Sequence, residues 1–328
     1  MQGKPLKLTR VRCAVCGADD GAPVGVGEDY EYRTSGDTFL AVRCRSCETV
    51  YLNPRPDVSE FERIYPSSYH AFDFSEQDFG IVYRIRSRLE AKRLLSLCEN
   101  LPADARILDV GCGDAFHLKL LRQYGEKTWT LEGVDLDERA VRMAEKTNLK
   151  IHLGGIEDLS LPEDSFDLAL MIQTVEHLEK PVETLAAVKT ILKPGGRLLI
   201  VTDNTDAFDF KIFKAAYWGG YHFPRHWNLF NRKSLGRLAE RAGFETIEIK
   251  TMVSPVNWVY SIHNGLVDWN APQFLINCFT LKSTVSLSAF TSLDIVLQRF
   301  GRGALLRAIL RKPEEDFSRR GHRGKREN

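Results

Sequence analysis

The chain has 328 residues, of which 43% are hydrophobic and 27% are charged. This composition predicts a soluble globular protein with one sizeable domain and room for a small second one. The formal net charge of +1 gives no electrostatic reason to expect a nucleic acid as a partner. The N-terminal sequence MQGKPLKLTR has no apolar core of the kind that a signal peptide needs, so we expect a cytoplasmic protein.

Two cysteine pairs, Cys13-x-x-Cys16 and Cys44-x-x-Cys47, lie near the N-terminus. Two such pairs separated by a spacer can bring four thiolates to the corners of a tetrahedron, which is the geometry of a structural Zn²⁺ site. We therefore predict a zinc-ribbon domain over residues 1–56, with a pair of redox-active CxxC motifs as the alternative. The other cysteines are interpreted as packing residues: Cys98, Cys112 and Cys278.

Residues 57–102 are expected to connect this domain to the next, because Pro54 and Pro56 favour extended backbone at the boundary. A basic amphipathic helix is predicted over 81–98, lying across the ligand cleft of the next domain. The aromatic residues before this helix could form a stacking wall for a ligand. We prefer a hydrophobic seam between the two domains, made by Phe61, Tyr65, Tyr69, Phe72, Phe74 and Phe79.

A strand, a glycine turn and a helix are predicted next. Residues 106–110 are a short apolar run that ends at Gly111 and Gly113. Apolar residues then recur every four positions up to Tyr124, and Gly125 is placed to cap the helix in the left-handed conformation. This layout is typical of a nucleotide or nucleoside site, because glycine lets a ligand approach the backbone closely. A dinucleotide fingerprint would need a small residue at the position of Phe116.

A second strand is predicted over 128–136, with Asp135 near its end. An acidic side chain in this position can accept hydrogen bonds from both ribose hydroxyls of a bound nucleoside. The alternative is that Asp135 caps the following helix, but Asp137 is better placed for that role.

Later segments, 155–158, 165–168, 176–178 and 192–196, separate further strands and helices. With Asp109-x-Gly111-x-Gly113 they resemble, in order and spacing, the motifs of class I S-adenosylmethionine (SAM) methyltransferases. That family often has a third glycine where this chain has Ala115. The resemblance implies an α/β fold with a doubly wound, Rossmann-like, seven-stranded sheet, and a core over 103–253. It also implies SAM as the cofactor, bound by Asp109, Gly111, Gly113, Asp135, Leu136, Ile156, Glu157 and Gln173.

Polar residues end the fourth and fifth predicted strands, and we expect Gln173, Asp203 and Asn204 to face the pocket. The alternative is that each binds only its own backbone. The segment 218–227 follows and is too rich in glycine and proline for regular structure, as functional loops often are. Ser234 is then predicted to cap a helix that ends at Gly243, before a sixth strand over 244–253.

The proton acceptor is predicted among the histidines, because the pKa of histidine is already close to neutral pH. We prefer His222, then His226, and then His177, which could instead be structural. Arg225 is expected to orient an anionic part of the acceptor, and Tyr221 and Asn204 to contact it. If no histidine serves, Tyr221 or Asp203 is the alternative base.

A helical insert is predicted over 254–303, serving as a substrate lid, a dimer face or a peripheral membrane contact, in that order of preference. It has no window apolar enough to cross a membrane. The last core strand is predicted over 304–313 and a disordered basic tail over 314–328. The tail contains Arg319, Arg320, Arg323, Lys325 and Arg326.

We therefore expect a SAM-dependent methyltransferase that acts on a small or carrier-linked metabolite, by O-methylation with a histidine base. The chain resembles zinc-ribbon methyltransferases of bacterial surface-polysaccharide and natural-product pathways. That resemblance implies a sugar, a lipid-linked glycan or a natural product as acceptor, reached from the cytoplasm or the inner membrane face. The alternative is a non-catalytic module of the same fold whose ribbon recruits a protein or RNA partner.

Overall fold

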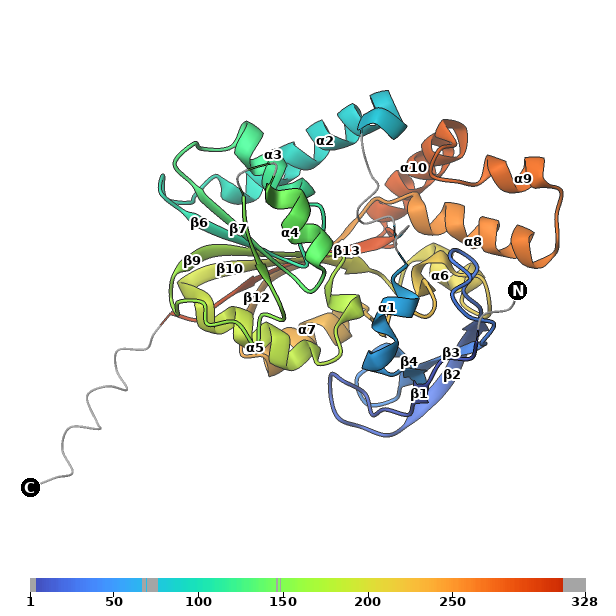
Figure 1. Cartoon of the computed structure of the whole chain (residues 1–328). Coiled ribbons are helices and arrows are strands. Elements are labelled where there is room, and N and C mark those ends of the chain that lie inside the picture. The colour runs from blue at the N-terminus through green and yellow to red at the C-terminus, as the bar shows by residue number, and fades with distance from the viewer. Residues whose placement is uncertain (1–3, 67–68, 70–75, 146, 148, 315–328) are drawn as a thin grey trace, which may run out of the picture.

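A computed structural model describes residues 4–66, 69, 76–145, 147 and 149–314. Its centre is a seven-stranded sheet with the strand order β12-β13-β10-β9-β6-β7-β8 (Figure 1). Strand β13 runs antiparallel to β10 and β12, and the pairs from β10 to β8 are parallel. The strands span Arg106–Val110 (β6), Thr130–Asp135 (β7), Lys150–Leu153 (β8), Phe166–Ile172 (β9), Leu192–Asp203 (β10), Glu245–Met252 (β12) and Leu305–Arg311 (β13). The predicted doubly wound, seven-stranded sheet is confirmed, and it is mixed.

Helices cover both faces of this sheet (Figure 1). Helices α2 and α3 pack on one face, where Leu94, Leu118 and Leu121 share a core with the strands. Helices α5 and α7 pack on the other, through Leu185, Val188 and Leu235. Their bounds, with that of α4, are Glu76–Cys98 (α2), Phe116–Tyr124 (α3), Glu138–Glu145 (α4), Pro181–Ile191 (α5) and Arg232–Arg241 (α7). The central parallel strands β6 and β9 are buried on both faces, which explains their largely apolar sequence.

The N-terminal module, residues 4–56, is built on a four-stranded sheet with the order β11-β4-β3-β2. Three of these strands come from the module itself, but β11 comes from the segment between β10 and α7 and pairs with β4. A separate pair, β1 with β5, completes the module. The bounds are Leu8–Thr9 (β1), Gly21–Gly27 (β2), Phe39–Cys44 (β3), Val50–Leu52 (β4), Arg55–Pro56 (β5) and Asn228–Leu229 (β11).

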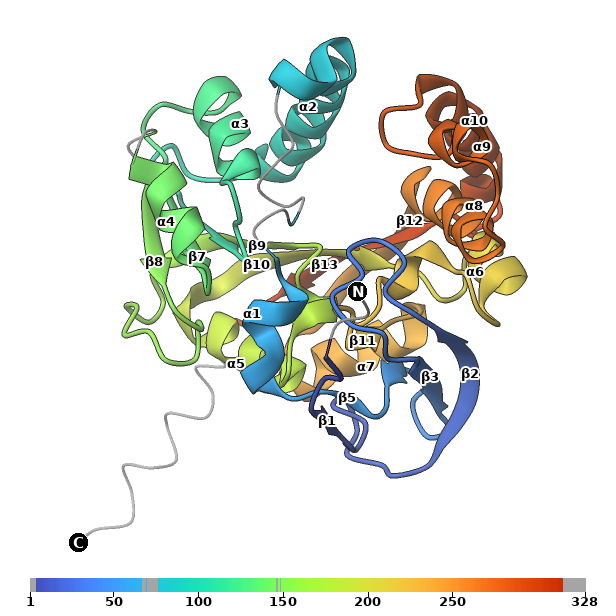
Figure 2. The same cartoon turned by 45° about the vertical axis from the view of Figure 1, so that its right-hand side comes forward.

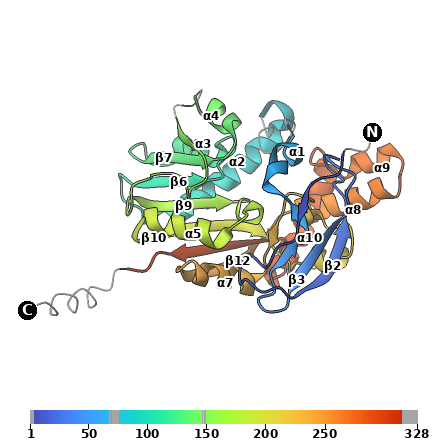
Figure 3. The ribbon, with the colours of Figure 1, turned by 60° about the horizontal axis from the view of Figure 1, so that its bottom comes forward.

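Three helices form the insert before the last strand. They lie at the end of the large sheet next to the N-terminal module, away from α3 and α4 (Figures 2 and 3). The insert helices are Val256–Asp268 (α8), Gln273–Cys278 (α9) and Thr284–Arg299 (α10). Short elements lie between the larger ones: Val58–Glu60 (η1), Phe61–Ile64 (α1), Val175–His177 (η3), Phe208–Phe213 (α6) and Gly219–Tyr221 (η4). No helix within the described residues is both long and apolar enough to cross a membrane.

Two predicted helix caps are wrong in detail. Gly125 follows α3 in an extended conformation, with φ −91° and ψ −171°. A Cβ there would lie 2.4 Å from the Trp129 ring, so packing rather than a left-handed φ requires glycine. Helix α7 begins after Asn231, whose side chain accepts a hydrogen bond from the Ser234 backbone while the Ser234 hydroxyl accepts one from the Asn231 backbone. Ser234 is thus the third residue of a capping box.

The predicted aromatic seam is present where the structure describes it. Phe61 stacks on Tyr65 and meets Trp227 edge-on, which joins α1 to the loop before β11. Tyr69 in turn packs edge-on against Tyr65. The predictions for Phe72, Phe74, the Phe79 side chain and the basic tail from residue 315 fall outside the described residues.

Candidate active site

The glycine turn after β6 has the backbone conformation that its sequence predicts. Gly111 and Gly113 have φ of +73° and +51°, and Ala115 also lies in the left-handed region at φ +60°. A Cβ on Gly111 would lie 2.5 Å from Thr174 Cγ2, so a side chain there would displace the loop after β9. The close approach of Thr174 and the positive φ therefore both exclude other residues at Gly111.

Asp135 ends β7 with its carboxylate directed at the glycine turn. It accepts hydrogen bonds from the backbone N–H groups of Gly113 (2.8 Å) and Asp137 (2.9 Å). Burial raises the pKa of Asp135. Asp137 caps α4 by accepting from the Arg139 N–H at 2.8 Å, which leaves Asp135 out of that role. A carboxylate has about four acceptor positions, so the two backbone bonds leave capacity for ribose hydroxyls.

Asp109 supplies a second carboxylate at the same turn. Its side chain is 1% exposed, and Oδ2 has no hydrogen-bond partner among the described residues. Nδ1 of His117 lies 3.7 Å from this oxygen. An unsatisfied buried carboxylate oxygen is costly. Its chemistry suits the ammonium group of the methionine part of SAM, so the residues present fit this cofactor.

The other residues predicted to bind the cofactor are Leu136, Ile156, Glu157 and Gln173. Leu136 is 66% exposed beside Asp135 and can offer an apolar surface, whereas Ile156 is buried in the core. Glu157 accepts a hydrogen bond from the Thr184 hydroxyl of α5. Gln173, with φ +53°, donates from its side-chain amide to Glu176 at 2.8 Å, so it faces the histidines described next.

Three histidines, His177, His222 and His226, meet beside the C-terminal ends of β9 and β10; we call them the histidine cluster. The His226 ring centroid lies 4.6 Å from that of His177 and 5.0 Å from that of His222. The backbone of Trp227 fixes this loop, because its N–H donates to the Glu176 carbonyl and its carbonyl accepts from the Leu52 N–H. The structure thus brings together the three residues predicted as candidate bases.

His226 is held as a neutral ring. Its Nδ1 lies 2.8 Å from the Gly220 carbonyl, which can only accept, so Nδ1 carries the hydrogen and Nε2 the lone pair. Burial lowers the pKa of His226 well below its usual value, and the neighbouring His177 and His222 lower it further. A neutral ring with a lone pair on one nitrogen is the form that a general base requires.

Two buried carboxyl groups lie behind the histidine cluster. Burial raises the pKa of Glu176 to about 8, and the charge of Asp203 adds to the effect. Burial likewise raises the pKa of Asp203 to about 7. Asp203 accepts from the Asn257 amide of α8 at 2.7 Å and lies 3.4 Å from Nδ1 of His226. One oxygen of Glu176 and one nitrogen each of His177 and His226 lie within 4.8 Å of one another, a spacing that could hold a metal ion.

Sequence reasoning missed two polar neighbours of the cluster. The Tyr65 hydroxyl lies 2.9 Å from Nδ1 of His177, and a Glu31 oxygen lies 2.7 Å from Nδ1 of His222. In the sequence, Tyr65 stands out only as an aromatic residue. No neighbouring residue indicates a role for Glu31, which lies far from His222 in the sequence. Only the fold brings these residues together.

The structure corrects three predicted substrate contacts. Arg225 is fully buried, and its guanidinium donates to both Asp29 oxygens at 3.1 and 2.9 Å. Asn204 is fully buried, and its amide donates to the Gly303 carbonyl while its oxygen accepts from the Asp206 N–H. The Tyr221 hydroxyl donates to the Lys214 carbonyl at 2.6 Å. These polar groups are already used within the protein, so they support the loop instead of contacting an acceptor.

Helix α8 forms a wall of the site. Ser261 Oγ accepts from the Gly219 N–H at 2.8 Å, and Trp258 stacks on Phe290 of α10 at 5.5 Å between ring centroids. A hollow of about 20 Å³ lies between this wall and the N-terminal module. It is lined by Glu28, Tyr30, Glu31, His222, Tyr260 and Asn264, among others. This space can hold water but not an acceptor ring, so an acceptor can enter only if a wall shifts.

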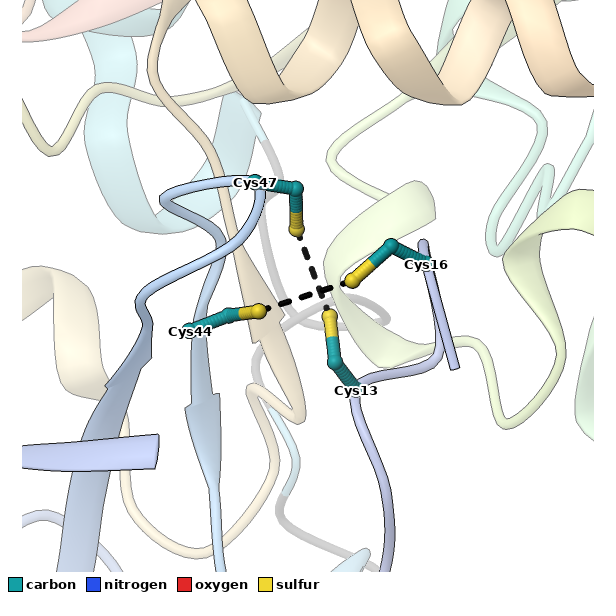
Figure 4. Close-up of side chains that lie close together, drawn as sticks. All are labelled: Cys13, Cys16, Cys44 and Cys47. Carbon is teal, nitrogen blue, oxygen red and sulfur yellow. Dashed lines mark hydrogen bonds between the residues drawn. The ribbon is translucent and has the colours of Figure 1, made fainter. Parts of the chain in front are cut away.

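The cysteine pairs of the N-terminal module converge in space (Figure 4). The Sγ atoms of Cys13 and Cys47 are 3.5 Å apart, as are those of Cys16 and Cys44, and all four lie within 4.8 Å of one another. They form no disulfide. Ligands at about 2.3 Å from a tetrahedral zinc ion are about 3.8 Å from each other. The cluster therefore has the dimensions of a site for one tetrahedral ion.

The fold and the glycine turn together define a class I methyltransferase. A sequence model of the methyltransferase domain family matches residues 82–249, and the chain belongs to this family of SAM-dependent methyltransferases. The prediction of a SAM-dependent enzyme is thereby confirmed.

Named relatives agree with this assignment. The ubiquinone biosynthesis O-methyltransferase of Dinoroseobacter shibae is 33% identical over 172 residues, covering 48% of this chain and 67% of that protein. The enzyme of the same name from Cereibacter sphaeroides is 29% identical over 166 residues, with the same coverage. A solved structure of phosphoethanolamine N-methyltransferase 2 from Haemonchus contortus, with SAM, has a TM-score of 0.52 and 16% identity. It covers 90% of this chain and 69% of that one, and shows the shared fold.

Proposed function

We propose that the protein transfers the methyl group of SAM to a hydroxyl oxygen, with a residue of the histidine cluster as general base. The observation that carries this proposal is the meeting of three imidazole rings at the strand ends next to the glycine turn. The His226 ring centroid lies 4.6 Å from that of His177 and 5.0 Å from that of His222. The similarity to enzymes named O-methyltransferases supports an oxygen acceptor.

SAM supplies an electrophilic methyl group with its own leaving group, so the protein has to orient the acceptor and remove its proton. The glycine turn and Asp135 would hold the nucleoside, and Asp109 would face the ammonium group. His222 is our preferred base and His226 the second. Both rings carry their hydrogen on Nδ1 when neutral, which leaves the lone pair on Nε2. The Nε2 lone pair of either ring would accept the hydroxyl proton as the new C–O bond forms.

For the acceptor we propose a small or carrier-linked metabolite, such as a sugar, a lipid-linked glycan or a natural product. The hollow beside His222 is lined by carboxylates and phenols, which suit hydroxyl-bearing groups. The insert would act as a lid, and its apolar side chains support a peripheral contact with the inner membrane face. The most exposed of these are Trp269 (69%), Phe274 (68%), Val285 (80%) and Phe300 (76%).

We also propose that the N-terminal module is a zinc ribbon that binds one structural Zn²⁺ through Cys13, Cys16, Cys44 and Cys47. The support is the spacing of the four Sγ atoms. A site closed by four cysteines leaves no position for substrate, so the ion would stabilise the module.

The test uses SAM with a tritiated methyl group and a panel of phenols, catechols and methyl hexopyranosides. We expect His222→Ala to lose most turnover, and His226→Ala to lose it to a smaller extent, while calorimetry shows unchanged SAM affinity. If His177→Ala, His222→Ala and His226→Ala all keep wild-type turnover, the histidine base is wrong. A protein that binds SAM but methylates neither the panel nor extracted lipids and glycans would favour a non-catalytic binding module.

A further inference from the structure

Glu31 of the N-terminal module lies beside the histidine cluster. One of its carboxylate oxygens lies 2.7 Å from Nδ1 of His222, and the two side chains are 19% and 9% exposed. An ionised carboxylate can only accept a hydrogen bond, so Nδ1 carries the hydrogen and the lone pair of neutral His222 is on Nε2.

We propose that Glu31 is a positioning residue that fixes the tautomer and orientation of His222, so that the N-terminal module completes the active site. This inference rests on the proposed function, in which His222 is the base. It gives the module a part in methyl transfer that a purely structural metal-binding domain would not have.

Contacts close to Glu31 and His222 fix the backbone that carries each side chain. Tyr260 of α8 lines the same hollow as Glu31, and burial together with the charge of Glu31 raises the pKa of the Tyr260 phenol. Glu31 follows Asp29, whose buried ion pair with Arg225 ties the module to the same loop. His222 itself has a left-handed backbone at φ +38°, and its N–H donates to the Gly219 carbonyl. The backbone beside each member of the pair is therefore held by contacts other than the pair itself.

Glu31 differs from the partners of the other two histidines. The Nδ1 atoms of His226 and His177 lie 2.8 and 3.2 Å from backbone carbonyls, of Gly220 and Arg225 respectively. A carbonyl fixes a tautomer, but a carboxylate also stabilises the protonated ring that forms when a base accepts a proton. The Glu31 oxygen lies 2.7 Å from Nδ1 of His222, whereas the carboxyl oxygen of Asp203 lies farther from Nδ1 of His226, at 3.4 Å.

The titration of His222 depends on all the groups that face it. Its ring centroid lies 5.0 Å from His226, and 6.0 Å from both Tyr32 of the N-terminal module and Tyr69 of the following segment. Tyr260 of α8 and Glu28 line the hollow that adjoins His222. Glu31 is the carboxylate in direct contact with the ring.

The experiment compares Glu31→Met, which has no acceptor, with Glu31→Gln, which keeps an acceptor oxygen without the charge. Nitrogen-15 NMR of the histidine rings in the full-length protein reports the tautomer and titration of His222 without any acceptor. We expect Glu31→Met to lose the single Nδ1–H tautomer and both variants to lower the titration midpoint, by about one pH unit in Glu31→Met. The control is Glu62→Gln, which removes the same charge from an exposed position on α1.

Turnover is measured with the panel acceptor that the wild type methylates fastest. We expect kcat to fall about 100-fold in Glu31→Met and less in Glu31→Gln, with KM, SAM affinity and zinc content unchanged. An unchanged His222 tautomer and titration in Glu31→Met, or kcat equal to that of Glu62→Gln, would overturn the proposal. Full activity of His222→Ala would instead refute the proposed base, while the NMR result would still show whether Glu31 holds the ring.

Discussion

Asp29 and Arg225 form an ion pair in which neither side chain has any exposed surface. The pair joins the N-terminal module to the histidine loop, and the Arg225 guanidinium also donates to the carbonyls of Ile64 and Phe223. Burial on its own would raise the pKa of Asp29, but the hydrogen bonds and charge of Arg225 hold that pKa below its usual value. This pair is therefore ionised. Each buried charge is stable only because the opposite charge of the partner balances it.

The first prediction concerns this pair. Asp29→Asn should lower the free energy of unfolding by about 3 to 5 kcal/mol, because it leaves a buried guanidinium without its counter-charge. Denaturant unfolding of the zinc-loaded protein measures the loss. Arg311→Gln, which breaks the exposed ion pair with Glu245, is the matched control and should change stability little. Equal stability of the two variants would contradict the structural role given to Arg225.

The second prediction concerns Asp135. Asp135→Ala should weaken SAM binding by roughly 2 to 4 kcal/mol, because hydrogen bonds to a charged acceptor are the strong kind. Calorimetry with SAM measures the change. Asp137→Ala serves as the comparison, since Asp137 caps α4 and is not expected to touch the ribose. If both variants bind SAM equally well, Asp135 serves only to accept the hydrogen bond from the Gly113 backbone N–H.

The third prediction concerns zinc. Protein purified without chelators should contain one zinc ion per chain, and Cys44→Ser should lose it. Structural zinc contributes on the order of 10 kcal/mol to the folding of small domains, so the N-terminal module should unfold first. Because Glu31 and Asp29 belong to this module, turnover should be lost while SAM affinity stays near wild type. Elemental analysis that finds no zinc would reject the site, and Cys278→Ser, which changes an exposed cysteine, controls for the substitution itself.

The fourth prediction concerns pH. Burial raises the pKa of Asp209 from 3.8 to about 7, although Trp218 Nε1 donates to its carboxyl at 2.8 Å. The folded state therefore holds a proton that the unfolded state has lost, and stability falls as pH rises between these two values. Asp209→Asn mimics the protonated form and should reduce that fall by up to about 1.4 kcal/mol per pH unit. Urea unfolding at several pH values measures the slope, and a slope equal to that of the wild type would contradict the assignment.

Much of the core could be predicted because its signals are local. The apolar run 106–110, the turn at Gly111 and Gly113 and the acidic end of β7 each lie within one short segment, and the structure places them as the periodicity indicates. The four cysteines converge for the same reason, since each pair is set by its own short turn.

The acceptor side could not be predicted in the same way, because its contacts join distant segments. The loop 218–227 has unusual composition, but its sequence does not say which polar groups face inward. The guanidinium of Arg225 could bind an anionic substrate group, but it already donates to both carboxylate oxygens of Asp29. Glu31 has no local signal, because its role depends on where the fold places His222. Similar long-range contacts use the side chains of Asn204 and Tyr221.

The pairing of β11 with β4 has a consequence for synthesis on the ribosome. Residues 4–56 emerge first, but their sheet gains its last strand only when Asn228 and Leu229 have been made and paired with Tyr51 and Val50. Until then β4 presents a bare edge, and unpaired edges of this kind attract other strands. The nascent chain would therefore need early protection at β4, and a fragment ending at residue 56 would carry that exposed edge permanently.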